Sequence, residues 1–163
     1  MIWRLKTGKG KELSAGNRIT RAAHKNKEIK KIMEHYKIIL SDLNTKNDFP
    51  LLAEVDEGET TNNIIIKAQL FGREITSSGE NYLPSYQEFR DKLLSLGYGI
   101  KCNGSRLNAV QSGMMGASDN IYLVTMGRKA RKEDIVSLWE YAEIDDFPDT
   151  AKQLAFFQKW LNG

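Results

Sequence analysis

The first strong pattern of apolar positions lies between Lys27 and Leu43. These apolar residues recur at intervals of three and four, the spacing of one face of an α-helix: Ile29, Ile32, Met33, Tyr36, Ile39, Leu40 and Leu43. The stripe continues backward through Ile19, so the pattern predicts a helix that begins near Asn17, a good N-cap residue. Polar residues from 44 to 50 are expected to end this helix.

Shorter apolar runs follow, and the polar residues between them favour strands. Residues 51–55 and 63–71 are joined by an acidic linker, as in an antiparallel hairpin with a long loop. Residues 72–75 are expected to continue the second strand past a bulge or bend. A second helix is predicted from Ser85–Glu88, because this segment has the form of a capping box, and Gly97 is a suitable stop.

The rest of the chain mixes short strands and helices. Residues 99–102 and 106–110 are predicted strands separated by Asn103-Gly104, a pair that favours tight hairpin turns, and residues 120–126 form another. Two helices close the chain, over roughly 132–142 and 150–161, the second capped by Asp149. This order predicts an α+β fold, a single domain over 1–163 with helices packed on an antiparallel sheet of about five strands.

The composition fits one globular domain. Of the 163 residues 40% are hydrophobic and 28% are charged, which is enough apolar material for a core. A single cysteine excludes an internal disulfide and fits a reducing compartment. No apolar run is long enough to cross a bilayer or to form the core of a secretion signal. We therefore expect a cytoplasmic protein without a membrane partner.

Charge is distributed unevenly along the chain. The first 37 residues hold eleven Lys and Arg against three Glu, a net charge of +8, and the whole chain carries +3, so the remainder carries −5. The basic residues between 4 and 37 could bind nucleic-acid phosphates. Alternatively, they form the solvated face of a helix and make ion pairs with the acidic rest of the chain. Residues 1–16 are expected to form a flexible basic segment.

The sequence offers no catalytic or metal-binding constellation, and we expect no cofactor. His24 and His35 lie eleven positions apart, which on one helix is about 16 Å, too far to share a metal ion. Cys102 lies in a predicted strand, where a buried structural thiol is more common than a nucleophile. Gly113-Met-Met-Gly116 matches the bare GxxG of an RNA-binding KH loop, but the predicted flanks are strands and no cation lies inside.

Two groups of polar residues are candidates for binding a partner. Arg106 follows the predicted turn with Asn103 and Ser112 nearby, and it can bind an anion or hold its own loop to a backbone carbonyl. The second group is an acidic run before the last helix, which forms a solvated linker or docks a basic partner. Its members are Glu140, Glu143, Asp145 and Asp146.

Four segments resemble a block found in small bacterial α+β proteins, the immunity proteins of polymorphic toxin and contact-dependent growth inhibition systems. They read CNGSR at 102–106, VQSGM at 110–114, NIYLV at 120–124 and GRKARKEDIV at 127–136, and lie within about a quarter of the chain. The family's members tend to carry proline at the position of Gln111. The resemblance implies a cytoplasmic protein that neutralises a cognate toxin by tight binding, without chemistry of its own.

Three hypotheses about function follow. The first is a toxin-neutralising immunity protein that contacts its partner through the acidic run or through the loop from Asn103 to Gly116. The second is a nucleic-acid-associated protein that uses its basic N-terminal region. The third is an enzyme with an unrecognised site, for which Arg106 and Cys102 are the first candidates.

Overall fold

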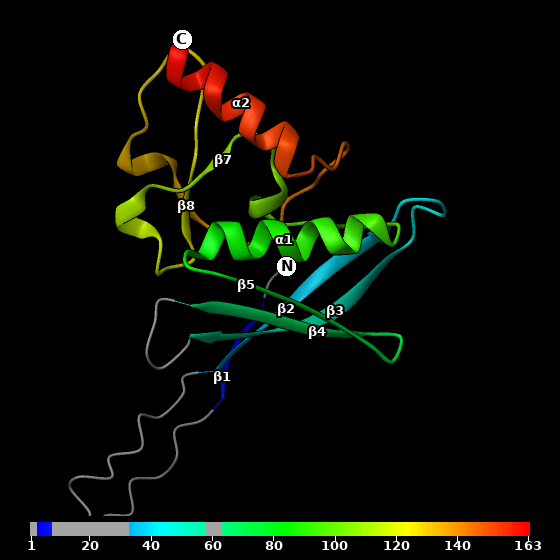
Figure 1. Ribbon diagram of the computed structural model, residues 1–163. Coiled ribbons are helices and arrows are strands. Elements are labelled where there is room, and N and C mark those ends of the chain that lie inside the picture. Colours follow the sequence, from blue (N-terminus) through cyan, green and yellow to red (C-terminus); the bar gives the residue numbers. More distant parts are fainter. Residues whose placement is uncertain (1–2, 8–32, 58–62) are drawn as a thin grey trace, which may run out of the picture.

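The computed structural model describes residues 3–7, 33–57 and 63–163, which form an α+β fold (Figure 1). Nine strands and two α-helices follow in the order β1 (Trp3–Thr7), β2 (Met33–Asp42), β3 (Asp48–Glu57), β4 (Ile64–Leu70), β5 (Arg73–Gly79), α1 (Tyr82–Ser95), β6 (Tyr98–Ile100), β7 (Ala109–Val110), β8 (Asn120–Leu123), β9 (Ile135–Ser137) and α2 (Thr150–Asn162). Short 3-10 helices lie at Asn103–Ser105, Gly113–Met115 and Lys132–Asp134.

The main sheet is antiparallel throughout, as the order of elements predicts. Its strands run β1-β2-β3-β4-β5, and β6 pairs with the end of β2, where Leu40 lies opposite Ile100. A second, small sheet has the order β7-β8-β9. Figure 1 shows three layers, in which α1 crosses the main sheet and the small sheet and α2 lie on the other side of α1. The described residues include no helix that combines the length and the apolarity needed to span a membrane.

The predicted helix over Lys27–Leu43 is wrong where it can be checked, because residues 33–42 form β2. The predicted beginning of this helix, from Asn17 to residue 32, lies outside the described residues. Of the predicted flexible segment 1–16, only residues 3–7, which form β1, are described. Within β2 the buried residues alternate as Tyr36, Ile38 and Leu40, the period of a strand. Some of these residues also fit the spacing of a helix face. Pairing with β3 along nearly the whole of β2 decides in favour of the strand.

The prediction that residues 72–75 continue the preceding strand past a bulge or bend is wrong, because β4 and β5 form a hairpin. Phe71 and Gly72 have positive φ values of 48° and 80° and reverse the chain, so β5 is a separate strand that pairs back onto β4. Positive φ at both central residues is the signature of a type I′ turn, whose twist matches that of the flanking strands. The apolar run of 63–71 thus ends at this turn.

The second predicted helix is present but begins earlier. It starts at Tyr82, after Asn81 as the N-cap, so the predicted capping box lies inside its second turn. The Ser85 hydroxyl instead donates a hydrogen bond to the Ile64 carbonyl (2.7 Å), which anchors α1 to β4. Gly97 ends the helix as predicted, with a left-handed φ of 94° that suits glycine.

The end of the chain contains two further corrections. Asn103-Gly104 belongs to a 3-10 helix, and the strands on either side of it, β6 and β7, join different sheets. The predicted helix over 132–142 is wrong, because a single 3-10 turn leads into β9 there. Residues 138–142 instead run beside 101–104 through backbone hydrogen bonds. Helix α2 is confirmed, with the Asp149 carboxylate accepting a hydrogen bond from the Lys152 amide (2.9 Å).

The core lies between the main sheet and α1 and continues to Trp139. The Trp139 side chain is fully buried and stacks on Tyr36, with ring centroids 5.0 Å apart. Its indole N–H donates a hydrogen bond to the Tyr82 hydroxyl (2.9 Å), so the buried polar atom has a partner. This one side chain connects β2, α1 and the C-terminal part of the chain.

Candidate protein-binding surface

Asn103 and Arg106, two of the residues predicted to bind a partner, contact their own loop. Asn103 is buried, donates a side-chain hydrogen bond to the Ser137 carbonyl (3.2 Å) and accepts one from Arg106 Nε (3.1 Å). Asn103 thereby fastens the 3-10 turn to β9 and leaves little of its own surface for a partner. Arg106 is half-buried, and its Nε contacts its own loop through the Asn103 side chain rather than a backbone carbonyl; binding of an anion by Arg106 stays a prediction.

Cys102 is also part of the core. Its side chain is fully buried, with the Tyr86 hydroxyl 3.0 Å from its sulfur. Burial raises the pKa of the Cys102 thiol, which keeps it in the unreactive protonated form. His35 lies on strand β2 beside Glu54 rather than on a helix, and His24 lies outside the described residues.

Ser112 lies half-buried at the start of the glycine loop, which is held by its neighbour Gln111. The Gln111 side-chain amide donates to the carbonyls of Met115, Ser118 and Asn120 (2.9 to 3.2 Å), and its oxygen accepts from the Leu83 amide (3.0 Å). A proline could make none of these side-chain hydrogen bonds. The loop conformation thus depends on a residue that sequence reasoning noted only as a departure from the family pattern.

The acidic run is the exposed part of the predicted binding set. Glu140, Glu143, Asp145 and Asp146 are all solvent-exposed; Glu140 lies within the segment that runs beside 101–104, and Glu143 directly follows that segment. The structure therefore separates the predicted residues into a loop group with structural contacts and an acidic group open to solvent.

One lysine, Lys101, is paired with Glu143 of this run and with Asp48 of β3. Lys101 Nζ is 2.7 Å from Asp48 Oδ2 and 3.3 Å from Glu143 Oε2. The hydrogen bond to Asp48 raises the pKa of Lys101, and a hydrogen bond from the Tyr141 hydroxyl contributes most to lowering the pKa of Glu143. Both shifts favour the charged forms. The surroundings of Lys101 consequently stay negative.

Beside the acidic group lies a cluster of three aromatic side chains that sequence reasoning missed. The ring of Phe49 lies 5.6 Å from those of both Phe71 and Tyr98, and Phe71 and Tyr98 are 6.1 Å apart. Phe49 and Tyr98 are half-buried, whereas Phe71 is 78% exposed. The cluster joins β3, the turn between β4 and β5, and β6, which only the folded sheet brings together.

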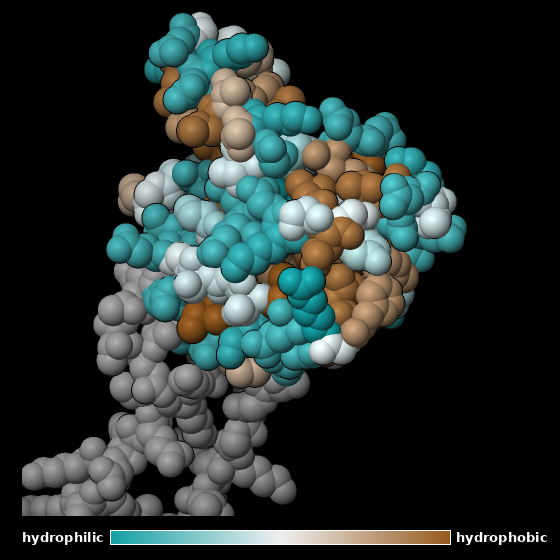
Figure 2. All heavy atoms as spheres, turned by 45° about the vertical axis from the view of Figure 1, so that its right-hand side comes forward, coloured by the Kyte–Doolittle hydropathy of each residue, from teal (hydrophilic) through white to brown (hydrophobic). Residues whose placement is uncertain are grey.

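The aromatic and acidic groups share this end of the molecule. Asp48 and Phe49 are neighbours in β3, and the Phe147 ring packs against Gly99, next to Tyr98. We call these residues the hairpin-end surface: Asp48, Phe49, Phe71, Tyr98, Glu143, Asp145 and Asp146. Figure 2 turns this end forward and shows hydrophobic residues gathered together with hydrophilic residues around them. An aromatic centre with a polar rim is the usual composition of a protein interface.

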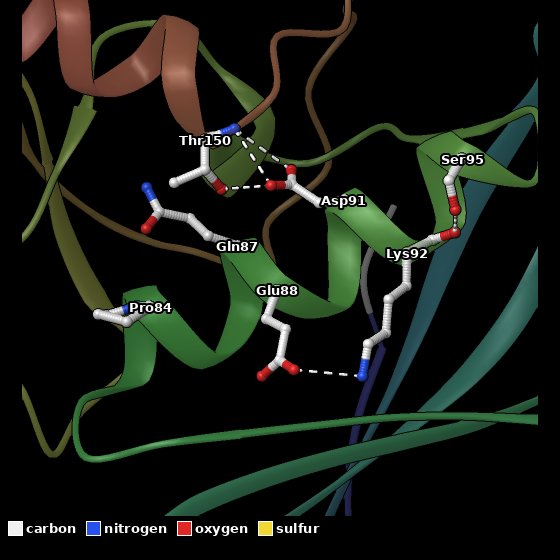
Figure 3. A pocket seen from close by; sticks show the side chains of 7 residues that line it. All are labelled: Pro84, Gln87, Glu88, Asp91, Lys92, Ser95 and Thr150. Carbon is white, nitrogen blue, oxygen red and sulfur yellow. Dashed lines mark hydrogen bonds and ion pairs between the residues drawn. The ribbon is translucent and has the colours of Figure 1, made fainter.

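A groove of about 510 Å³ with charged side chains in its walls lies between α1 and the start of α2 (Figure 3). Its charged side chains contact one another. Lys92 Nζ is 3.2 Å from Glu88 Oε1, and Asp91 accepts hydrogen bonds from both the amide and the hydroxyl of Thr150. The Asp91–Thr150 contacts join the two helices, the Lys92–Glu88 pair lies within α1, and both carboxylates are engaged within the protein.

In the described part of the chain, no group of three or more His, Cys, Asp or Glu side chains is arranged to hold a metal ion. Comparison of the sequence with protein-family models and with curated proteins finds no match.

Proposed function

We propose that this protein neutralises a bacterial toxin in the cytoplasm by binding the toxin domain directly. The hairpin-end surface carries the proposal, because it combines exposed aromatic area with carboxylates on a folded sheet end. The resemblance of residues 102–136 to immunity proteins supplies the type of partner. Neutralisation of this kind needs affinity rather than a reaction, so it requires no catalytic group.

Charge gives the surface a means of finding its partner. Asp48 and Glu143 share one lysine, and Asp145 and Asp146 follow Glu143 as exposed residues of the same segment, so the balance of charge in this segment is negative. A negative surface steers a positively charged partner into encounter and raises the association rate, an effect that salt screens. We therefore expect a toxin domain with a basic face.

The test uses the C-terminal domain of the protein encoded directly upstream of this gene. The full chain should protect cells that express that domain and should co-purify with it. Asp146→Lys should slow association by about tenfold at low salt, because it reverses one charge in the rim. Glu133→Lys, an equal charge reversal at an exposed position on a different segment, is the matched control and should have little effect.

Three results would contradict the proposal. They are the absence of a toxin gene in that position, failure of the full chain to protect cells, and equal effects of the two charge reversals. Salt-sensitive binding to DNA or RNA that disappears on charge reversal at Lys27, Lys30 and Lys31 would instead support the nucleic-acid hypothesis.

A further inference from the structure

The turn between β4 and β5 holds an aromatic residue in a conformation that aromatic residues avoid. Phe71 has a φ of 48°, in the left-handed region, and Gly72 follows with a φ of 80°. Turns of this type favour Asn-Gly, because asparagine and glycine tolerate positive φ, whereas a Cβ with a bulky substituent crowds the backbone there. Phe71 is therefore unfavourable for the turn that it occupies.

Packing within the protein does little to offset that cost. The Phe71 side chain is 78% exposed and touches Phe49 and Tyr98 only at the edge of the cluster, with tilted rings. Phe89, by comparison, is fully buried in the core. Burial of an aromatic ring is its main contribution to stability, so a ring that stays in water contributes little. Strained residues that the fold does not need are typical of functional sites.

We infer that Phe71 is the anchor of the hairpin-end surface and inserts into an apolar pocket of the partner protein, a pocket rimmed by Lys or Arg. This inference rests on the proposed function and specifies the partner's surface. Phe49 and Tyr98 support the ring from below as half-buried neighbours. The acidic side chains of Asp145 and Asp146 face the basic rim.

The charge around Phe71 favours a protein over a membrane. Anionic lipids repel carboxylates, and the described charges near the turn offer no excess of cations to attract such lipids. Lys101 is paired with Asp48 and Glu143, and the exposed Arg73 that follows the turn is next to the exposed Glu74. A rigid aromatic side chain surrounded by polar groups is instead typical of a protein hot spot, which fills a pocket while the rim excludes water. The partner's pocket should therefore be apolar at its floor and positive at its edge.

The test compares Phe71→Asn with Leu161→Asn. Both replace an exposed apolar side chain, and Leu161 is 60% exposed on α2, outside the hairpin-end surface. Phe71→Asn should weaken binding to the upstream toxin domain by about 30-fold, which corresponds to about 2 kcal/mol at 1.4 kcal/mol per factor of ten. Leu161→Asn should leave the Kd within about twofold of wild type, a change of less than 0.5 kcal/mol on the same scale.

A second readout uses this chain alone and does not need the partner. The urea midpoint of Phe71→Asn should stay within about 0.3 M of wild type, whereas Phe89→Leu, a core variant, should lose about 1 M. Phe71→Gly should have a higher midpoint than Phe71→Ala, the reverse of the usual order, because glycine accepts the positive φ.

The outcomes separate the inference from the proposed function. A wild-type chain that fails to bind the toxin domain contradicts the proposed function, whereas wild-type affinity in Phe71→Asn overturns only the inference. A loss of stability in Phe71→Asn as large as that in Phe89→Leu would mean that Phe71 stabilises the fold, and this result would also overturn the inference. Two further results would overturn it by identifying another occupant: a wild-type dimer that becomes monomeric in Phe71→Asn, or Phe71-dependent binding to phosphatidylglycerol vesicles.

Discussion

Substitution of Gln153 by leucine should release α2 from the rest of the protein. Gln153 is the only residue of this helix that is buried, at 2% exposure, so the helix depends on it to an unusual degree. Leucine has a similar size but forms no hydrogen bonds. The change therefore removes polar contacts while keeping most of the volume.

The magnitude follows from the four hydrogen bonds of this side chain. Its oxygen accepts from Gln87 Nε2 (3.0 Å) and from Arg90 Nη1 (2.6 Å), and its Nε2 donates to the carbonyls of Gly104 (3.0 Å) and Arg106 (2.7 Å). At about 1 kcal/mol net for each bond, and more for the charged one, the upper limit is about 5 kcal/mol. Detachment of α2 lets the orphaned groups reach water, so we expect a loss of about 2–4 kcal/mol.

Hydrogen exchange measured by mass spectrometry is the direct assay. Amides of residues 154–162 should exchange at least about 30-fold faster in Gln153→Leu, since 1.4 kcal/mol is a factor of ten in the opening equilibrium. Amides of β2 and β3 should change less, because α1 lies between these strands and α2 (Figure 1). Gln158→Leu, on the exposed side of the same helix, is the control and should leave exchange unchanged. Exchange of residues 154–162 within about threefold of wild type in Gln153→Leu would refute the reasoning.

Three further predictions concern the glycine loop, the 3-10 turn and the buried thiol. Gly104→Ala should cost about 1–3 kcal/mol in urea unfolding, whereas Gly113→Ala should stay within about 0.5 kcal/mol. The reason is that a Cβ at Gly104 would lie 2.7 Å from Leu138 Cγ, whereas one at Gly113 meets open space; equal costs would contradict this packing. Gln111→Leu should speed amide exchange across 112–119 by tenfold or more, at about 1.4 kcal/mol per tenfold, and unchanged exchange would mean that other contacts hold the loop. Cys102 should react with a disulfide reagent only after unfolding, and rapid labelling of the native protein would contradict its burial. Because burial raises the pKa of the Cys102 thiol, only the unfolded thiol ionises just above pH 8.5, so the free energy of unfolding should fall as the pH rises above about 8.5.

The sequence determined the class of the fold and its most local features. Alternating or continuous apolar runs located β3, β4 and the sheet, and the cap at Asp149 and the stop at Gly97 located one end of each helix. These signals are readable because one or a few neighbouring residues make the interaction that matters, such as a side chain that accepts from an amide three positions later. The exposed acidic run was also readable, since charged residues between elements stay in water.

Tertiary structure decided the rest, for the opposite reason. The apolar residues of β2 fit a helix and a strand, and only pairing with other segments, β3 on one edge and β1 and the far later β6 on the other, selects the strand. The aromatic cluster joins Phe49, Phe71 and Tyr98 from three elements, so no window of sequence contains it. Phe71 reads locally as one more apolar residue at the end of a strand. Its strain and exposure, on which the anchor inference rests, exist only because the chain reverses at that position and pairs β5 with β4.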